Sequence, residues 1–112
     1  MDECPSAIDG IVEISRHRYG VLISGDPSGL SQLARLILWL AKVDQSQCDT
    51  MPDGERIHVH LYPGRQLTPS SVDVEVSRLD AKGTGAFPAR YIGQALPGKR
   101  GPRQRGARRN RR

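Results

Sequence analysis

The residues best suited to chemistry lie in one short alternating segment of the chain. His58 and His60 are separated by a single residue, so in an extended strand their imidazoles would point to the same side. A facing strand carrying Asp73 and Glu75 would add carboxylates beside them. A zinc site needs three or four ligands in fixed geometry, and the third histidine, His17, lies far away in the sequence. We therefore interpret the segment as a polar sheet face and expect no metal and no cofactor.

A second candidate for chemistry is the segment Ser-Gly-Asp-Pro-Ser-Gly at residues 24–29. Its residue types suggest a nucleophile turn or a phosphate loop, but its spacing matches neither G-x-S-x-G nor the P-loop. The same residues are typical of a helix start, because Asp26 can cap free amide hydrogens and Pro27 suits the first helical position. We expect no catalytic residue here, and a protein that is not an enzyme.

The hydrophobic pattern predicts the elements that position these residues. Apolar and polar residues alternate, as in half-buried strands, in three segments; these are residues 8–15, 55–62 and 71–79. Residues 19–24 are predicted as a further strand because they are rich in β-branched and aromatic residues. A turn is expected at residues 16–18. The order strand, strand, helix, strand, strand predicts an α+β fold, in which a small antiparallel sheet has one amphipathic helix on one face and water on the other.

The helix between the second and third strands is predicted from Pro27 to about Val43. At about 100° per residue its apolar residues form one broad face that we expect to cover the sheet; they are Leu30, Leu33, Ala34, Ile37, Leu40 and Ala41, flanked by Leu36 and Leu38. Trp39 lies nearly opposite this face. We expect Trp39 to be either covered by residues 87–96 or exposed as an anchor for a partner, since aromatic side chains are typical of binding hot spots.

Charge divides the chain into a body and a tail. The 112 residues fit one small domain and carry 17 Lys and Arg against 12 Asp and Glu, a net charge of +5. Eight of the basic residues lie between Lys99 and Arg112, so residues 1–98 hold nine basic and 12 acidic residues, a net charge of −3. We expect four parts: a flexible N-terminus, an α+β domain, a connector able to dock, and a disordered Arg-rich tail. Their bounds are 1–7, 8–80, 81–97 and 98–112.

The tail offers a second kind of binding. Arginines neutralise phosphates, which predicts salt-dependent and sequence-independent attraction to RNA or DNA. No aromatic residues are interleaved for stacking on bases. The candidate polyanion contacts are Arg100, Arg103, Arg105, Arg108, Arg109, Arg111 and Arg112. A solvated tail without a partner is the alternative.

The N-terminal sequence and the cysteines indicate the compartment. Residues 1–5 are acidic and include a proline, unlike the basic and apolar start of a secretory signal. The longest apolar run, residues 36–41, has six residues, whereas a spanning helix needs about 20. Cys4 and Cys48 are too few for a secreted disulfide scaffold, so free thiols are expected. We expect a cytoplasmic protein with no membrane partner.

Several short motifs in the middle of the chain carry a family resemblance. They are Gly25-Asp26, Gly29-Leu30, Leu33-Ala34, Leu40-Ala41, Gly54 followed by Ile57-His58, and a strand from Ser70-Ser71 through Glu75 to Arg78. Together, over about residues 11–79, they resemble bacterial immunity protein family 32, which is associated with polymorphic toxin systems. The chain departs from the family pattern at Arg56, where a histidine would be expected, and in its arginine tail.

The resemblance implies a small α+β protein that protects a cell by binding and neutralising a cognate toxin, without catalysis. A small domain without an evident cleft is compatible with this role, because its polar sheet face or the Trp39 side of its helix can meet a partner. We predict a non-enzymatic immunity protein, with RNA or DNA binding through the tail as the alternative. The candidate partner contacts are Trp39, Arg56, His58, His60, Asp73 and Glu75.

Overall fold

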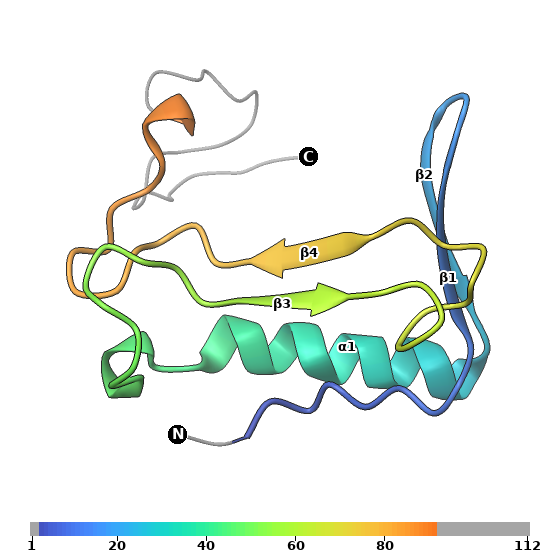
Figure 1. Cartoon of the computed structure of the whole chain (residues 1–112), viewed down its shortest axis with the longest axis horizontal. Helices are drawn as coiled ribbons and strands as arrows, with labels where there is room; N and C mark the ends of the chain where they lie inside the picture. The colour runs from blue at the N-terminus through green and yellow to red at the C-terminus, as the bar shows by residue number, and fades with distance from the viewer. Residues whose placement is uncertain (1–2, 92–112) are drawn as a thin grey trace, which may run out of the picture.

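The computed structural model describes residues 3–91 and shows an α+β arrangement of one long helix and two β-hairpins (Figure 1). The predicted order of strand, strand, helix, strand, strand is confirmed. The elements are β1 (Val12–His17), β2 (Gly20–Gly25), α1 (Pro27–Lys42), β3 (His58–Leu61) and β4 (Val74–Ser77), with short 3-10 helices at Gln45–Gln47 and Ala89–Tyr91.

The first hairpin is shifted along the chain from its predicted position. β1 and β2 are antiparallel, with register pairs from Val12↔Gly25 to His17↔Gly20, so the turn is at residues 18–19 and not at 16–18. Gly20 has a φ of 143°, a backbone conformation that glycine adopts without steric cost. This freedom lets the chain reverse directly before Gly20, and β1 therefore continues to His17.

Residues 8–11, predicted as strand, instead cross the first turn of the helix. The amide of Gly10 donates to Gln32 Oε1 at 2.8 Å, and the amide of Ile11 donates to Asp26 Oδ1 at 3.0 Å. The crossing is close: a Cβ at Gly29 would lie 2.2 Å from the Ile11 carbonyl oxygen. Contact with the helix start has therefore replaced strand pairing in this segment.

The four strands form two separate sheets of two strands each. β3 and β4 are antiparallel, from His58↔Ser77 to Leu61↔Val74. Residues 68–72 link the sheets: the amides of Thr68 and Val72 donate to the carbonyls of Val12 and Ile14, each at 2.9 Å.

The link between the sheets also explains why the strand predicted at residues 71–79 is shorter. The amide of Ile14 donates to the Ser71 hydroxyl at 3.0 Å. A side-chain oxygen thus takes a place where a regular ladder would use a main-chain carbonyl. The regular strand begins only at Val74. β3 is shortened in a similar way at its start. The Ile57 amide donates to Gln45 Oε1 at 2.8 Å, and β3 begins at the next residue, His58.

The helix has the predicted bounds but a narrower buried face. Asp26 caps its start by accepting from the Gly29 amide at 2.7 Å, and Val43 is its C-cap. Its buried residues are Gly29, Leu33, Leu36 and Leu40. The core that they join contains Val12, Ile14, Leu61 and Leu67.

The predicted broad face of the helix is therefore wrong in part. Leu36, expected at the flank, is fully buried. Five residues expected on the core face or beside it are exposed, namely Leu30, Ala34, Ile37, Leu38 and Ala41. Two-stranded sheets are narrow, so they cover one stripe of a helix and leave the adjoining apolar stripe outside the core.

Candidate partner-binding surface

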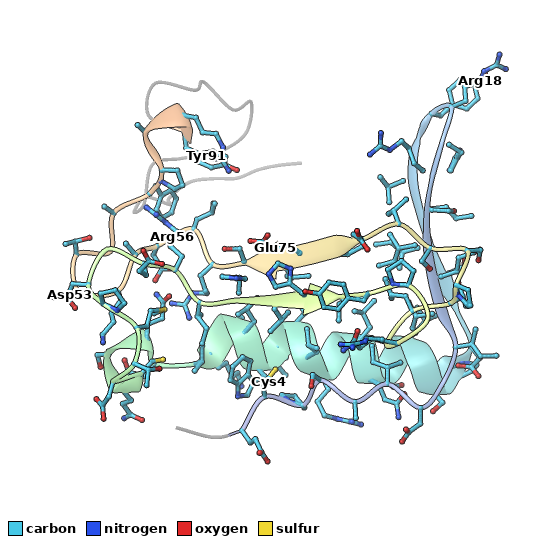
Figure 2. All side chains as sticks on the ribbon, in the orientation of Figure 1. Cys4, Arg18, Asp53, Arg56, Glu75 and Tyr91 are labelled. Atoms are coloured by element: carbon cyan, nitrogen blue, oxygen red, sulfur yellow. The ribbon has the colours of Figure 1, made fainter. Side chains whose placement is uncertain are left out.

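The outer face of the β3–β4 hairpin carries most of the residues predicted to contact a partner. Along β3, Val59 and Leu61 point inward and Leu61 is fully buried, whereas His58 and His60 are exposed. Residues of a strand alternate between its two faces, which puts both imidazoles on the solvent side. His60 pairs in register with the exposed Glu75 of β4, which Figure 2 shows above β3 in the middle of the molecule.

The side chains on this face form a continuous row, which we call the β3 ladder (His58, His60, Tyr62 and Arg65). The rings of His58 and His60 meet edge to face with centroids 5.0 Å apart. The rings of His60 and Tyr62 are stacked at 5.7 Å, with 10° between their planes. The Arg65 guanidinium carbon lies 5.7 Å from the centre of the Tyr62 ring. Such contacts hold the exposed side chains in fixed relative positions.

Two members of the ladder were not among the predicted contacts. Tyr62 continues the same spacing of two residues as His58 and His60, so the alternation already contained this signal. Arg65 comes from the loop after β3, and only the path of that loop brings it over Tyr62. Asp73, a predicted contact, joins them at this end: it lines a shallow hollow with Tyr62, Pro63 and Arg65.

Arg56 lies at the opposite end of β3 and is engaged within the protein. Its Nε donates to the Leu79 carbonyl at 2.5 Å and its Nη2 donates to the Ala86 carbonyl at 2.7 Å. The side chain therefore holds residues 79–86 against the start of the hairpin (Figure 2). The Arg56 carbonyl lies 3.1 Å from His58 Nδ1, which connects this contact to the ladder.

Trp39 lies in a different place. It is half-buried on α1 and lines a hollow with Lys42, Gln47, Glu3 and Pro5. The N-terminal segment thus flanks Trp39, where residues 87–96 were expected as one possible cover; residues 92–96 lie outside the described residues. The hollow has no wall from β3 or β4, so Trp39 does not share the surface of the β3 ladder.

The remaining features considered in the sequence are metal ligands, the cysteines, a membrane span and the tail arginines. Among residues 3–91 no group of three His, Cys, Asp or Glu side chains could hold a metal ion. Cys4 and Cys48 are free thiols, as predicted, and burial raises the pKa of the Cys4 thiol, which disfavours its reactive thiolate form. No helix in the described part of the chain is long and apolar enough to cross a membrane. The tail arginines, Arg100 to Arg112, lie outside the described residues.

The fold and this surface define a class of small α+β domain that presents an exposed row of aromatic and charged side chains. The model of the family described as Immunity protein 32 matches residues 20–79. This span is more than half of the 112 residues, and the chain belongs to that family. The matched span runs from β2 through β4 and contains the whole β3 ladder. No curated protein and no solved structure matches the chain.

Proposed function

We propose that this protein is an immunity protein that binds a cognate toxin directly and neutralises it in the cytoplasm, without catalysing a reaction. The β3 ladder is the observation that supports this proposal, because it offers a surface suited to binding a protein. Tyr and Arg are enriched among the residues that dominate interface energies. Here Tyr62 and Arg65 are exposed beside each other, at the end of a row that lies within the matched family segment.

Preorganisation of the ladder supports its use as a binding surface. Each long side chain that becomes fixed on binding costs about 0.5–1.5 kcal/mol in lost freedom. The ring contacts of His60 and Tyr62 already restrict these side chains in the free protein. A partner that packs on the row therefore meets a surface with less rotamer freedom left to lose.

The charge of the body supports a basic partner. Residues 1–98 have a net charge of −3, and Asp73 and Glu75 lie on the same exposed hairpin as the ladder. Opposite charges on two partners raise the association rate, and salt weakens this effect. We expect a toxin domain with a positive face, and an association rate that falls as the salt concentration rises.

The test begins with the genes on either side of this one. A neighbouring secreted protein with a toxin-like C-terminal domain should be lethal when that domain is expressed alone, and harmless when it is expressed with this protein. Purified together, the two should form a stable complex. Survival without complex formation, or toxicity despite co-expression, would contradict direct neutralisation.

Binding of RNA or DNA by residues 98–112 stays a prediction and is tested separately. Retention of the full chain and of a chain ending at residue 97 would be compared on immobilised RNA at low and high salt. Equal retention of the two chains would show that residues 98–112 do not bind nucleic acid.

A further inference from the structure

β2 is an open edge strand within residues 3–91. It pairs with β1 on one side, and no other described strand pairs with it. The hairpin projects from the body of the molecule, with Arg18 at its far tip (Figures 1 and 2). An open edge presents main-chain N–H and C=O groups that can pair with a further strand.

The direction of these main-chain groups follows from bonds on the other edge of the hairpin. Val12 and Ile14 of β1 use their carbonyls to accept from residues 68–72, on the side away from β2. In an antiparallel pair, residues opposite each other point their main-chain groups the same way relative to the pair, either both inward or both outward. Ile23 is opposite Ile14, so Ile23 and, by alternation, Val21 direct their groups to the open side.

β2 lacks the residues that usually protect an exposed edge strand from pairing with another strand. Residues 20–25 contain no charged residue and no proline, the features with which exposed edges usually avoid pairing. Val21, Leu22 and Ile23 are 64%, 48% and 54% exposed. An apolar edge of this kind is expected to be covered by another chain.

The exposed stripe of α1 adjoins this edge. Leu30, Ala34, Ile37 and Ala41 are spaced by four, three and four residues and are all exposed. This spacing is that of a helix seam that packs against another helix. The stripe begins beside β2, because a Cβ at Gly25 would lie 3.3 Å from Leu30 Cγ. We call the combined surface the β2–α1 patch (Val21, Leu22, Ile23, Leu30 and Ile37).

The patch gathers several exposed apolar side chains in one part of the molecule. It holds five of the eleven large hydrophobic side chains that are exposed in the described chain. Such a concentration exceeds the scattered exposed hydrophobics that need no explanation, and it marks an interaction site.

The charges at the two ends of β2 identify the occupant. Arg18 lies in the turn at the tip of the hairpin (Figure 2), and Asp26 directly follows β2 at its other end. If two copies of β2 pair antiparallel about a two-fold axis at Leu22, Val21 lies opposite Ile23 of the second copy, and these residues carry the outward main-chain groups. Antiparallel pairing also brings the turn that carries Arg18 beside the base of the other β2, where Asp26 lies. The edge is therefore complementary to itself, as a two-fold interface requires.

Asp26 keeps an oxygen for this contact. Its Oδ1 accepts from the amides of Gly29 and Ile11, and no described residue donates to its Oδ2. A charge-assisted bond from Arg18 of the second copy can therefore form without loss of the helix cap.

We propose that the β2–α1 patch binds a second copy of this chain, by antiparallel pairing of the two β2 strands about Leu22. The β1–β2 hairpins of the two copies then form one continuous sheet of four strands. The β3 ladder belongs to the other hairpin and does not take part in the contact, so each copy keeps a ladder for its partner.

The first test is the mass of the full chain in solution, measured by sedimentation at a salt concentration that suppresses contacts of the tail. The expected mass is twice the 12.3 kDa of one chain. Val21→Lys should reduce it to one chain, because a charge on the edge blocks strand pairing. Val21→Thr is the control: it keeps a β-branched residue and should remain a dimer. Circular dichroism and thermal unfolding verify that both variants fold.

The second test fixes the register. In a chain whose Cys4 and Cys48 are replaced by serine, Leu22→Cys should form a disulfide-linked dimer on mild oxidation, since a non-hydrogen-bonded pair at the axis brings Cα atoms to about 4.5 Å. Ser24→Cys should crosslink far less, because the two Ser24 residues lie on opposite sides of the axis, four residues apart along the paired strands. A monomeric wild type, or a dimer that Val21→Lys leaves intact, would overturn the proposal. If the wild type is a monomer and Val21→Lys also loses toxin binding, the β2 edge binds the toxin and not a second copy of this chain.

Discussion

Arg78 and Asp80 form a two-point ion pair at the end of β4. Arg78 Nε donates to Asp80 Oδ1 at 2.8 Å, and Arg78 Nη2 donates to Asp80 Oδ2 at 2.7 Å. The third guanidinium nitrogen, Nη1, donates to the carbonyls of Leu40 at 3.1 Å and Val43 at 2.8 Å. Asp80 thus orients an arginine that satisfies two free carbonyls at the end of α1, and the pair joins the second hairpin to the helix.

Removing this guanidinium should destabilise the protein. Arg78→Ala leaves the carbonyls of Leu40 and Val43 without their donor, and we expect the free energy of unfolding to fall by about 2 kcal/mol. Arg78→Lys should recover only part of the loss, because an ammonium group does not reproduce the planar fork. Urea unfolding measures both, with Arg16→Ala on the exposed end of β1 as the control. An Arg78→Ala midpoint equal to that of Arg16→Ala would contradict this role.

Stability should fall at acid pH. Hydrogen bonds from Arg78 lower the pKa of Asp80, and hydrogen bonds from the amides of Gly29 and Ile11 lower the pKa of Asp26. A carboxyl whose pKa is lower in the folded state stabilises the fold fully above its unfolded pKa, about 3.9. The stabilisation is lost as the pH falls through the folded value. Urea midpoints should therefore be steady between about pH 5 and 7 and decrease below about pH 4.

The contribution of Asp80 to this acid sensitivity can be measured separately from that of the other carboxyl groups. Asp80→Asn removes the titrating group, so its urea midpoint should be lower at neutral pH but should fall less steeply below about pH 4 than that of the unchanged chain. Identical slopes for the two chains would show that Asp80 is not responsible for the acid loss.

A methyl group at Gly29 should disrupt the crossing of residues 8–11 over the helix. In an open helix, glycine to alanine is favourable by about 1 kcal/mol. At this site the new Cβ would lie 2.2 Å from the Ile11 carbonyl oxygen, and backbone atoms have to move. We expect Gly29→Ala to lower the free energy of unfolding by about 1–3 kcal/mol, the usual cost of overpacking. Ser31→Ala, on an exposed position of α1, is the control, and a stabilising Gly29→Ala would disprove the close approach.

Truncating the ladder should weaken binding of the proposed toxin partner with little effect on stability. Tyr62 contacts both His60 and Arg65, so Tyr62→Ala removes the centre of the row. We expect Kd for the cognate toxin to rise at least about tenfold, which corresponds to about 1.4 kcal/mol. Ser77→Ala, an exposed change on β4, serves as the control in titration calorimetry. Equal affinities of the two variants would place the toxin contact elsewhere.

The elements of the fold were predictable from sequence because local chemistry specifies them. Asp26 and Pro27 mark the helix start, and the capping bond to Gly29 forms within one turn. The alternation around His58 and His60 likewise fixes which side chains face water, since strand geometry alone sets it. Family membership was also accessible, as it rests on motifs in the same segment. Of the β3 ladder, His58 and His60 were predicted as contacts, whereas Tyr62, which shares their alternation, was not.

The remaining features depend on which parts of the chain meet. The helix is apolar on two adjoining stripes, and sequence periodicity assigns both to one face; only the narrow hairpins determine that Leu36 is buried while Leu30 and Ile37 are exposed. The strand ends follow from distant bonds, such as that of Ile14 with Ser71. Arg65 reaches Tyr62 through a loop. The sequence by itself thus determined the elements and their order, because these depend on neighbouring residues, whereas long-range packing decided which surfaces are left for partners.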